Sequence, residues 1–228
     1  SQMGMTVHVV SGAPRPWRVL LGLTFKGLDY DINYLQASKR EHKSEPFISL
    51  NPRGTVPVLE AEGLVLRDSI GILAWLDRAY PDRPLFGGSA NEAAAIWQAT
   101  LESCDYLRAA SDGLLRPIFF GGATSKTPEL TEAAESMQAE LRRLEDLLNS
   151  GDFLSGNGPS AADAVSYPEV RLVQRAVETT SELMAELGFQ EPLTGYPHVS
   201  AWKRRIEALD GFERTLPPHW RGQREGHE

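Results

Sequence analysis

Cysteine is almost absent from this sequence, since Cys104 is the single cysteine among 228 residues. One thiol cannot form a disulfide within the chain, and it excludes the Cys-x-x-Cys pairs that bind metals or exchange electrons. We therefore expect a protein of a reducing compartment, the cytoplasm. The five histidines are scattered, with neither HxxxH nor HExxH spacing, so no metal site is predicted.

Several familiar motifs and segment types are missing as well. Neither GxxxxGK(S/T) nor GxGxxG occurs, which excludes the common phosphate-binding loops, and no GxSxG marks a hydrolase nucleophile. No apolar run approaches the ~20 residues of a membrane-spanning helix, and we expect no secretory leader. The net charge of −8 at pH 7 disfavours nonspecific binding to a phosphate backbone. Nucleic acid and membranes are therefore not expected as partners.

What the sequence does contain falls into two halves with different patterns. Over 5–82, short strand-like and helical segments alternate, which predicts an α/β domain. The predicted order is a strand at 6–10, a helix at 17–26 that Gly27 stops, a strand at 28–35, a short helix ending at Asn51-Pro52, a hairpin turning near Glu62-Gly63, and a helix at 69–80.

A linker rich in proline and glycine at 81–88 separates this half from a second one that is helical throughout. The predicted helices cover 91–117, a stretch from Pro128 that Thr127 caps, 160–179 and 199–209. Ser160 and Asp163 form a variant capping box, which we interpret as structural. We predict an all-helical domain over 89–220, with a loose polar tail after Pro217.

Three stretches could carry a binding site. At SGAPRPWRV, Ser11–Val19, a strand end leads into a helix start, a junction that binds anions in many folds. A cis bond between Val56 and Pro57 would expose the Val56 backbone to an extended peptide, although an ordinary strand start fits as well. Asp68 and Ser69 stand where the hairpin meets the next helix. They could hold both charged ends of an α-amino acid, with Ser69 capping the helix, or form a plain N-cap.

The order and spacing of five segments resemble the cytosolic glutathione transferase superfamily across nearly the whole chain. These segments are WRVLLGLTFKGLDYD, EPFISLNPRGTVPVL, LRDSIGILAWLDRAYP, FLSGNGPSAADAVSYP and YPHVSAWKRRIEAL. The resemblance implies a thioredoxin-like N-terminal domain that binds glutathione as co-substrate, and an all-helical C-terminal domain that carries the pocket for an electrophile. It also implies a homodimer, with the active site beside the interface, and a role in detoxification.

The resemblance assigns glutathione contacts to the residues that match the family's motifs. The backbone of Val56, which precedes the cis-proline position Pro57, would pair with the cysteinyl unit of glutathione. Asp68 and Ser69 match the pair that holds the γ-glutamyl end, where Asp68 is one methylene shorter than the family's usual Glu. This assignment agrees with the amino-acid site that the two residues suggest by themselves.

Other contacts follow from the same resemblance. His42 matches a residue that some classes use for the glycyl carboxylate, and Lys43 or Arg53 could serve instead. In the helical half, Tyr106 and Arg116 could line the electrophile pocket.

The position of the family's thiol-activating residue is unusual here. Trp17–Val19 resembles the zeta-like classes, and this alignment places Ala13 where a catalytic Ser or Cys would stand. Alanine can neither hydrogen-bond the glutathione sulfur nor form a mixed disulfide with it. The Ser11 hydroxyl could reach the sulfur after a small loop shift, or Arg15 could stabilise a thiolate by charge. Otherwise Ser11 caps a backbone group and Arg15 is a solvated side chain.

We therefore predict a glutathione transferase that stabilises the thiolate of glutathione and conjugates it to, or uses it to transform, a small hydrophobic electrophile. One alternative is a non-catalytic member of the fold that binds glutathione, another ligand or a protein, which Ala13 favours. A second alternative is a zeta-like isomerase that uses glutathione as a true cofactor, which the Trp17–Val19 motif favours.

Overall fold

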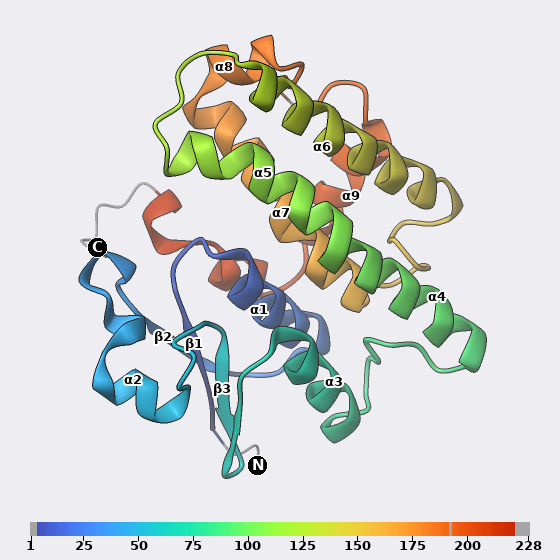
Figure 1. Cartoon of the computed structure of the whole chain (residues 1–228). Helices are drawn as coiled ribbons and strands as arrows, with labels where there is room; N and C mark the ends of the chain where they lie inside the picture. Colours follow the sequence, from blue (N-terminus) through green and yellow to red (C-terminus); the bar gives the residue numbers. More distant parts are fainter. Residues whose placement is uncertain (1–3, 192, 222–228) are drawn as a thin grey trace. The chain divides into compact units, whose positions relative to one another are not determined.

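The structure of the protein is a computed structural model that describes residues 4–191 and 193–221 (Figure 1). The chain divides into two compact units, the first formed by the residues up to Phe86 together with those from Ala208 onward, the second by Gly87–Glu207. A sheet with helices makes up the first unit and helices make up the second. This confirms the predicted fold class.

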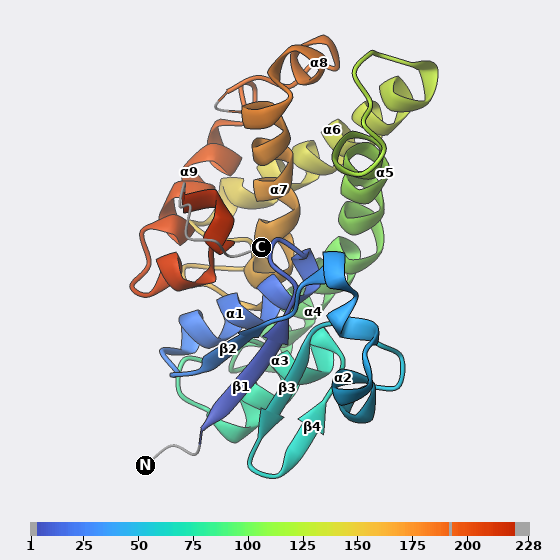
Figure 2. The ribbon, with the colours of Figure 1, turned by 90° about the vertical axis from the view of Figure 1, so that its left-hand side faces the viewer.

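Four strands form the sheet of the first unit: β1 (Met5–Val9), β2 (Asp31–Tyr34), β3 (Val58–Ala61) and β4 (Leu64–Leu66). They lie side by side in the order β2-β1-β3-β4 (Figure 2). β1 is parallel to β2 and antiparallel to β3, and β3 is antiparallel to β4. The predicted hairpin is confirmed, and its turn at Glu62 and Gly63 has positive φ at both residues.

The two faces of the sheet carry different helices. Met5, Val7 and Val9 point to the face where α1 (Pro14–Lys26) and α3 (Ser69–Ala79) complete a buried apolar core. The intervening His8 has its ring 5.8 Å from that of Phe47 on α2 (Glu45–Leu50), because side chains alternate along a strand. α1 begins earlier than predicted, since a proline suits the first helical position, and it ends at the predicted Gly27.

The end of the described chain belongs to the first unit, although the sequence predicts a helical domain as far as 220. Short 3-10 helices at Phe212–Thr215 and Pro218–Arg221 form this C-terminal segment. The indole Nε1 of Trp17 donates to Thr215 Oγ1 at 3.1 Å. The tail was predicted to be loose after Pro217, which is wrong for 218–221, and 222–228 lie outside the described residues.

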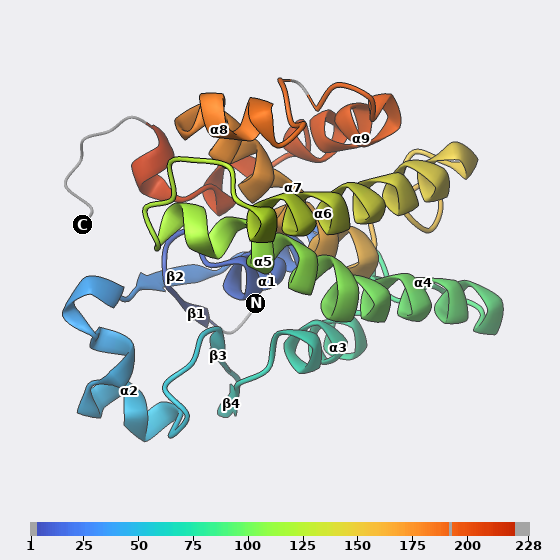
Figure 3. The ribbon, with the colours of Figure 1, turned by 45° about the horizontal axis from the view of Figure 1, so that its top comes forward.

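Helices make up the second unit (Figure 3). They are α4 (Ala90–Glu102), a π-helical turn at Ser103–Leu107, α5 (Arg108–Phe119), α6 (Pro128–Leu147), α7 (Ala161–Thr179), α8 (Ser181–Glu186) and α9 (Pro197–Glu207). α5 packs against α6 and α7, and α4 packs against α7. The π-helical turn divides the single helix predicted over 91–117. Thr127 caps α6 as predicted, because its hydroxyl accepts from the amide of Leu130.

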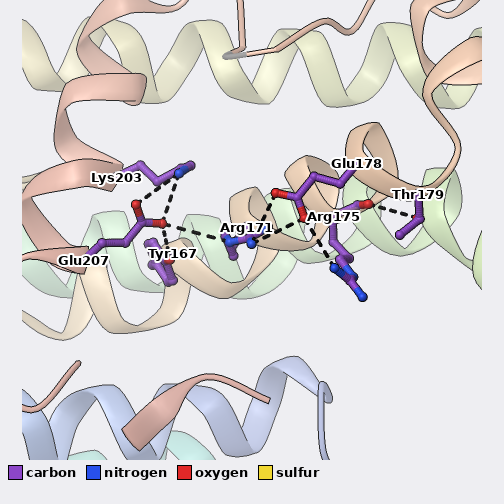
Figure 4. A network of polar contacts seen from close by, with 7 residues as sticks. All are labelled: Tyr167, Arg171, Arg175, Glu178, Thr179, Lys203 and Glu207. Atoms are coloured by element: carbon purple, nitrogen blue, oxygen red, sulfur yellow. Dashed lines mark hydrogen bonds and ion pairs between the residues drawn. The ribbon is translucent and has the colours of Figure 1, made fainter. Parts of the chain in front are cut away.

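A polar network joins α7 to α9 inside this unit (Figure 4). The Tyr167 hydroxyl donates to Glu207 Oε2 at 2.6 Å, and Lys203 Nζ contacts the same carboxylate at 3.0 Å. Burial and the negative charge of Glu207 raise the pKa of Tyr167 well above its usual value, so this side chain remains a donor. Arg171 links Glu207 to Glu178, at 4.0 and 3.4 Å. The network is structural and fixes α9 on α7.

Among the residues that the structure describes, no helix is both long enough and apolar enough to cross a bilayer. Within the same residues, no three His, Cys, Asp or Glu side chains gather as a metal ion would need.

Candidate functional site

The junction between β1 and α1 holds the stretch Ser11–Val19. The chain turns at Gly12, whose φ of 84° favours glycine, and Ala13 is the N-cap of α1 with no side-chain bond to the helix. Pro14 and Pro16 carry no N–H, so Arg15 provides the one amide donor among positions 14–16. The start of α1 therefore has fewer amide donors for binding an anion than an ordinary helix start has.

Ser11 is half-buried in this junction and pairs with a residue of the C-terminal segment. Its Oγ lies 3.0 Å from Nδ1 of His219. This partner could not be predicted from the sequence, because 208 positions separate the two residues and the segment around His219 has no regular pattern. Arg15 is exposed on the first turn of α1.

The bend at Val56 lies at the same end of the sheet as Ser11. The Val56-Pro57 peptide bond is cis, as the resemblance to the family implies. β1 pairs with β3 so that His8 stands opposite Val58, and continuing this register by two residues places Val10 opposite Val56. The pairing stops at Val58, so the Val56 backbone lies beyond the ladder, where an extended peptide could add as a further strand.

The loop before Val56 is held by a buried asparagine. Asn51 is 1% exposed, and its Nδ2 donates to the carbonyl oxygen of Thr55 at 2.8 Å and to Thr55 Oγ1 at 3.0 Å. Its Oδ1 accepts from the Arg53 amide at 3.1 Å. These bonds explain how the residues NPRGT set the position of the bend.

This loop also brings together the three candidates for a carboxylate contact. Lys43 Nζ lies 3.4 Å from the carbonyl oxygen of Arg53. Gly54, with φ of 62°, packs so closely that a Cβ there would lie 2.9 Å from the carbonyl oxygen of His42. These backbone contacts place His42, Lys43 and Arg53 on neighbouring stretches of chain, here called the basic cluster, although the net charge of the whole chain is negative.

The surroundings of His42 in this cluster favour the neutral form of its imidazole. Partial burial, the positive charge of Lys43 and that of Arg40, in this order, lower its pKa below the ordinary value. Its Nδ1 is removed from solvent and has no hydrogen-bond partner among the residues that the structure describes. A carboxylate arriving here would therefore meet cations beside an uncharged imidazole.

The helix after the hairpin is capped one residue earlier than predicted. Asp68, not Ser69, is the N-cap, and its Oδ1 accepts from the amides of Ile70 and Gly71, both at 2.9 Å. Asp68 is exposed, and neither bond uses Oδ2. The Ser69 hydroxyl accepts instead from the buried Arg18 at 3.2 Å, which ties α3 to α1. The Asp68 carboxylate thus accepts from the amides of Ile70 and Gly71 but not from the amide of Ser69, the first residue of α3.

The two candidates for the electrophile pocket lie in the second unit. Tyr106 is 64% exposed on the π-helical turn. Arg116 bonds both oxygens of Asp112, at 3.1 and 3.2 Å, and stands 5.8 Å from the centre of the Phe120 ring. A groove of about 820 Å³ in this unit is lined by α4, α6 and the loop after α6, without either residue. Their role in substrate binding stays a prediction.

The fold and the site together define a class of protein: a thioredoxin-like domain with a cis-proline bend beside its first helix, followed by a helical domain. Two family profiles match the chain. "Glutathione S-transferase, N-terminal domain" matches residues 13–79, and "Glutathione S-transferase, C-terminal domain" matches residues 109–210.

Individual proteins show the same relationship. Glutathione S-transferase theta-1 of Mus musculus is 30% identical over 202 residues, which cover 84% of this chain and 78% of the mouse protein. Maleylpyruvate isomerase of a Ralstonia species is 28% identical over 211 residues, covering 88% and 91%. The crystal structure of a glutathione S-transferase from the Antarctic clam Laternula elliptica superimposes with a TM-score of 0.82 at 27% identity, covering 96% of this chain and 95% of that one. The chain belongs to the cytosolic glutathione transferase superfamily.

Proposed function

We propose that the protein binds glutathione along the Val56 bend, stabilises its thiolate at the β1–α1 junction, and transfers the sulfur to a small hydrophobic electrophile bound by the helical unit. The observation that carries this proposal is the antiparallel pairing of β1 and β3, which brings the β1–α1 junction and the cis Val56-Pro57 bend to the same end of the sheet. The proposal also includes that the enzyme is a homodimer, that it works in the cytoplasm and that it acts in detoxification.

The three parts of glutathione fit three parts of the first unit. The Val56 backbone pairs with the cysteinyl unit, as an added strand would. Asp68 receives the ammonium group of the γ-glutamyl end, and the Ser69 amide receives its carboxylate. The basic cluster of His42, Lys43 and Arg53 receives the glycyl carboxylate. Opposite charges thus meet at both ends of the peptide.

The magnitudes favour Ser11 as the group that stabilises the thiolate. The dipole of a helix start stabilises an anion by about 0.3–1 kcal/mol, which is less than one unit of thiol pKa at about 1.4 kcal/mol per unit. Pro14 and Pro16 lack amide hydrogens, which weakens this stabilisation of an anion at the start of α1 further. A hydrogen bond to a charged group contributes about 1.5–3 kcal/mol, so the Ser11 hydroxyl would supply at least one unit. Arg15 could add charge from the first turn of α1.

Replacing Ser11 with alanine should lower kcat roughly tenfold, since the thiolate loses about one unit of stabilisation. The affinity for glutathione should stay close to that of the wild type, because the peptide contacts lie elsewhere. Steady-state kinetics and calorimetric titration measure the two effects separately. The Ser11→Thr variant keeps a hydroxyl and is the control. Unchanged turnover in Ser11→Ala would remove Ser11 from the mechanism.

The proposal as a whole is tested by binding and then by turnover. The protein should be retained on immobilised glutathione and should conjugate glutathione to chlorodinitrobenzene or to another member of a broad electrophile panel. Failure to bind glutathione would overturn the proposal. Binding without turnover on the whole panel would favour the alternative that Ala13 supports, a binding protein without catalysis.

A second candidate function is glutathione-dependent isomerisation. The similarity to maleylpyruvate isomerase over 88% of this chain favours it, together with the zeta-like motif at Trp17–Val19. In this reaction the thiolate would add to a substrate and leave again, so glutathione would be regenerated. Incubation with maleylpyruvate at a small, fixed amount of glutathione distinguishes the two, since a transferase stops when glutathione is consumed and an isomerase does not.

A further inference from the structure

The hydrogen bond between Ser11 and His219 has no role in the function proposed above. Ser11 Oγ and His219 Nδ1 lie 3.0 Å apart, at the place where the thiol of glutathione would be activated. The imidazole also stands over the turn, since a Cβ on Gly12 would lie 3.9 Å from His219 Cε1.

The segment that carries His219 is anchored on α1 and on the residue before β2. The Trp17 indole donates to Thr215 and packs edge-on against Trp220, with ring centres 5.5 Å apart. Arg214 donates to the carbonyl oxygen of Tyr30 at 2.8 Å and lies 4.3 Å above the centre of its ring. Trp17 and Thr215 are buried and Trp220 is half-buried, so contacts to the unit flank His219, which is itself exposed.

We propose that His219 is a positioning residue for thiol activation, which acts through Ser11 as an acceptor of the thiol proton. This inference rests on the proposed function. The imidazole carries its own proton on Nε2, and Nδ1 accepts the hydrogen bond of the Ser11 hydroxyl. The Ser11 oxygen then faces the glutathione thiol with a lone pair.

The proton moves in two linked transfers. The S–H bond of glutathione breaks as Ser11 Oγ gains that proton, and the original Oγ–H bond breaks as His219 Nδ1 gains its proton. The electron pair stays on sulfur, so the products are a thiolate, an intact Ser11 hydroxyl that donates to it, and an imidazolium. After the thiolate has attacked, His219 returns the proton through Ser11 to the leaving group or to the product.

The chemistry of the junction explains why such an acceptor is useful here. Ala13 offers no hydroxyl, and two of the first three helical positions of α1 offer no amide. A serine hydroxyl alone can donate to a thiolate, but it does not hold an extra proton near neutral pH. Imidazole does, because its ordinary pKa of about 6.5 lies close to neutrality.

Two substitutions of His219 test the inference with glutathione and the electrophile that the wild type turns over. His219→Phe keeps a ring beside Trp220 and removes the acceptor, whereas His219→Asn keeps a hydrogen-bonding side chain that cannot take up a proton. We expect kcat to fall roughly three- to tenfold in both variants, for a loss of about half a unit to one unit of thiol acidity. The affinity for glutathione should stay unchanged. The ultraviolet absorbance of bound thiolate at neutral pH should fall in parallel with kcat.

A double-mutant cycle shows whether His219 acts through Ser11. In a Ser11→Ala background, His219→Phe should cause no further loss, because the path to His219 is already broken. Additive losses would overturn the inference, and so would wild-type thiolate absorbance in His219→Phe or full activity in His219→Asn. If the wild type itself fails to bind glutathione, the proposed function fails first. An active wild type with unaffected His219 variants rejects the role of His219 alone.

Discussion

Replacing Asp163 with alanine should lower the free energy of unfolding by about 3–5 kcal/mol. Asp163 is 0% exposed and is the acceptor at the start of α7. It accepts from the amides of Leu154 and Ser160 at 3.0 and 2.8 Å and from the Trp202 indole at 2.7 Å. Alanine would leave these buried donors without their acceptor, and each such loss costs about 1–3 kcal/mol.

The measurement is urea unfolding followed by tryptophan fluorescence, with the capping residue Ser89 as a matched control. Ser89 caps α4 by accepting from the Glu92 amide at 3.2 Å, but it is exposed. Ser89→Ala should therefore cost about 0.5–2 kcal/mol, as surface caps do. If Asp163→Ala costs no more than Ser89→Ala, the buried capping box does not hold the second unit together.

Features that depend on a few neighbouring residues could be predicted from the sequence. Gly27 ends α1, Thr127 caps α6, and Ser160 with Asp163 starts α7, because each signal and its effect lie within one helical turn. The capping residue at α3 was misplaced by one position. Asp68 and Ser69 are both good caps, and what distinguishes them is the Arg18 side chain that engages the Ser69 hydroxyl from another helix.

The places of the candidate residues could be proposed from the sequence, but not their partners. Local patterns pointed to Val56 and Asp68 and the family resemblance to His42, and their roles in binding stay predictions. The pairing of Ser11 with His219 depends instead on how the C-terminal segment packs on Trp17, which no local pattern encodes. The resemblance to the family places Ala13, which has no hydroxyl or thiol, at the position of the thiol-activating residue. The sequence already offered Ser11 and Arg15 as substitutes, and the structure added the pairing of Ser11 with His219.

Replacing Asp68 with asparagine should weaken glutathione binding roughly 10- to 100-fold, because a charge-assisted bond to the ammonium group is worth about 1.5–3 kcal/mol. Asparagine caps a helix as well as aspartate does, so the Oδ1 bonds to Ile70 and Gly71 can persist and the free energy of unfolding should hardly change. Calorimetric titration with glutathione and urea unfolding measure these two quantities on the same variant.

The alanine variant separates recognition from capping at this position. Asp68→Ala should lose the same affinity and, in addition, about 0.5–2 kcal/mol of stability, because the cap of α3 is gone. Equal affinities of Asp68→Asn and the wild type would show that the charge of Asp68 does not meet the ligand, even if Asp68→Ala binds weakly. In that case the weak binding of Asp68→Ala would come from a frayed first turn of α3, and the ammonium group would have to be sought at another carboxylate of the first unit.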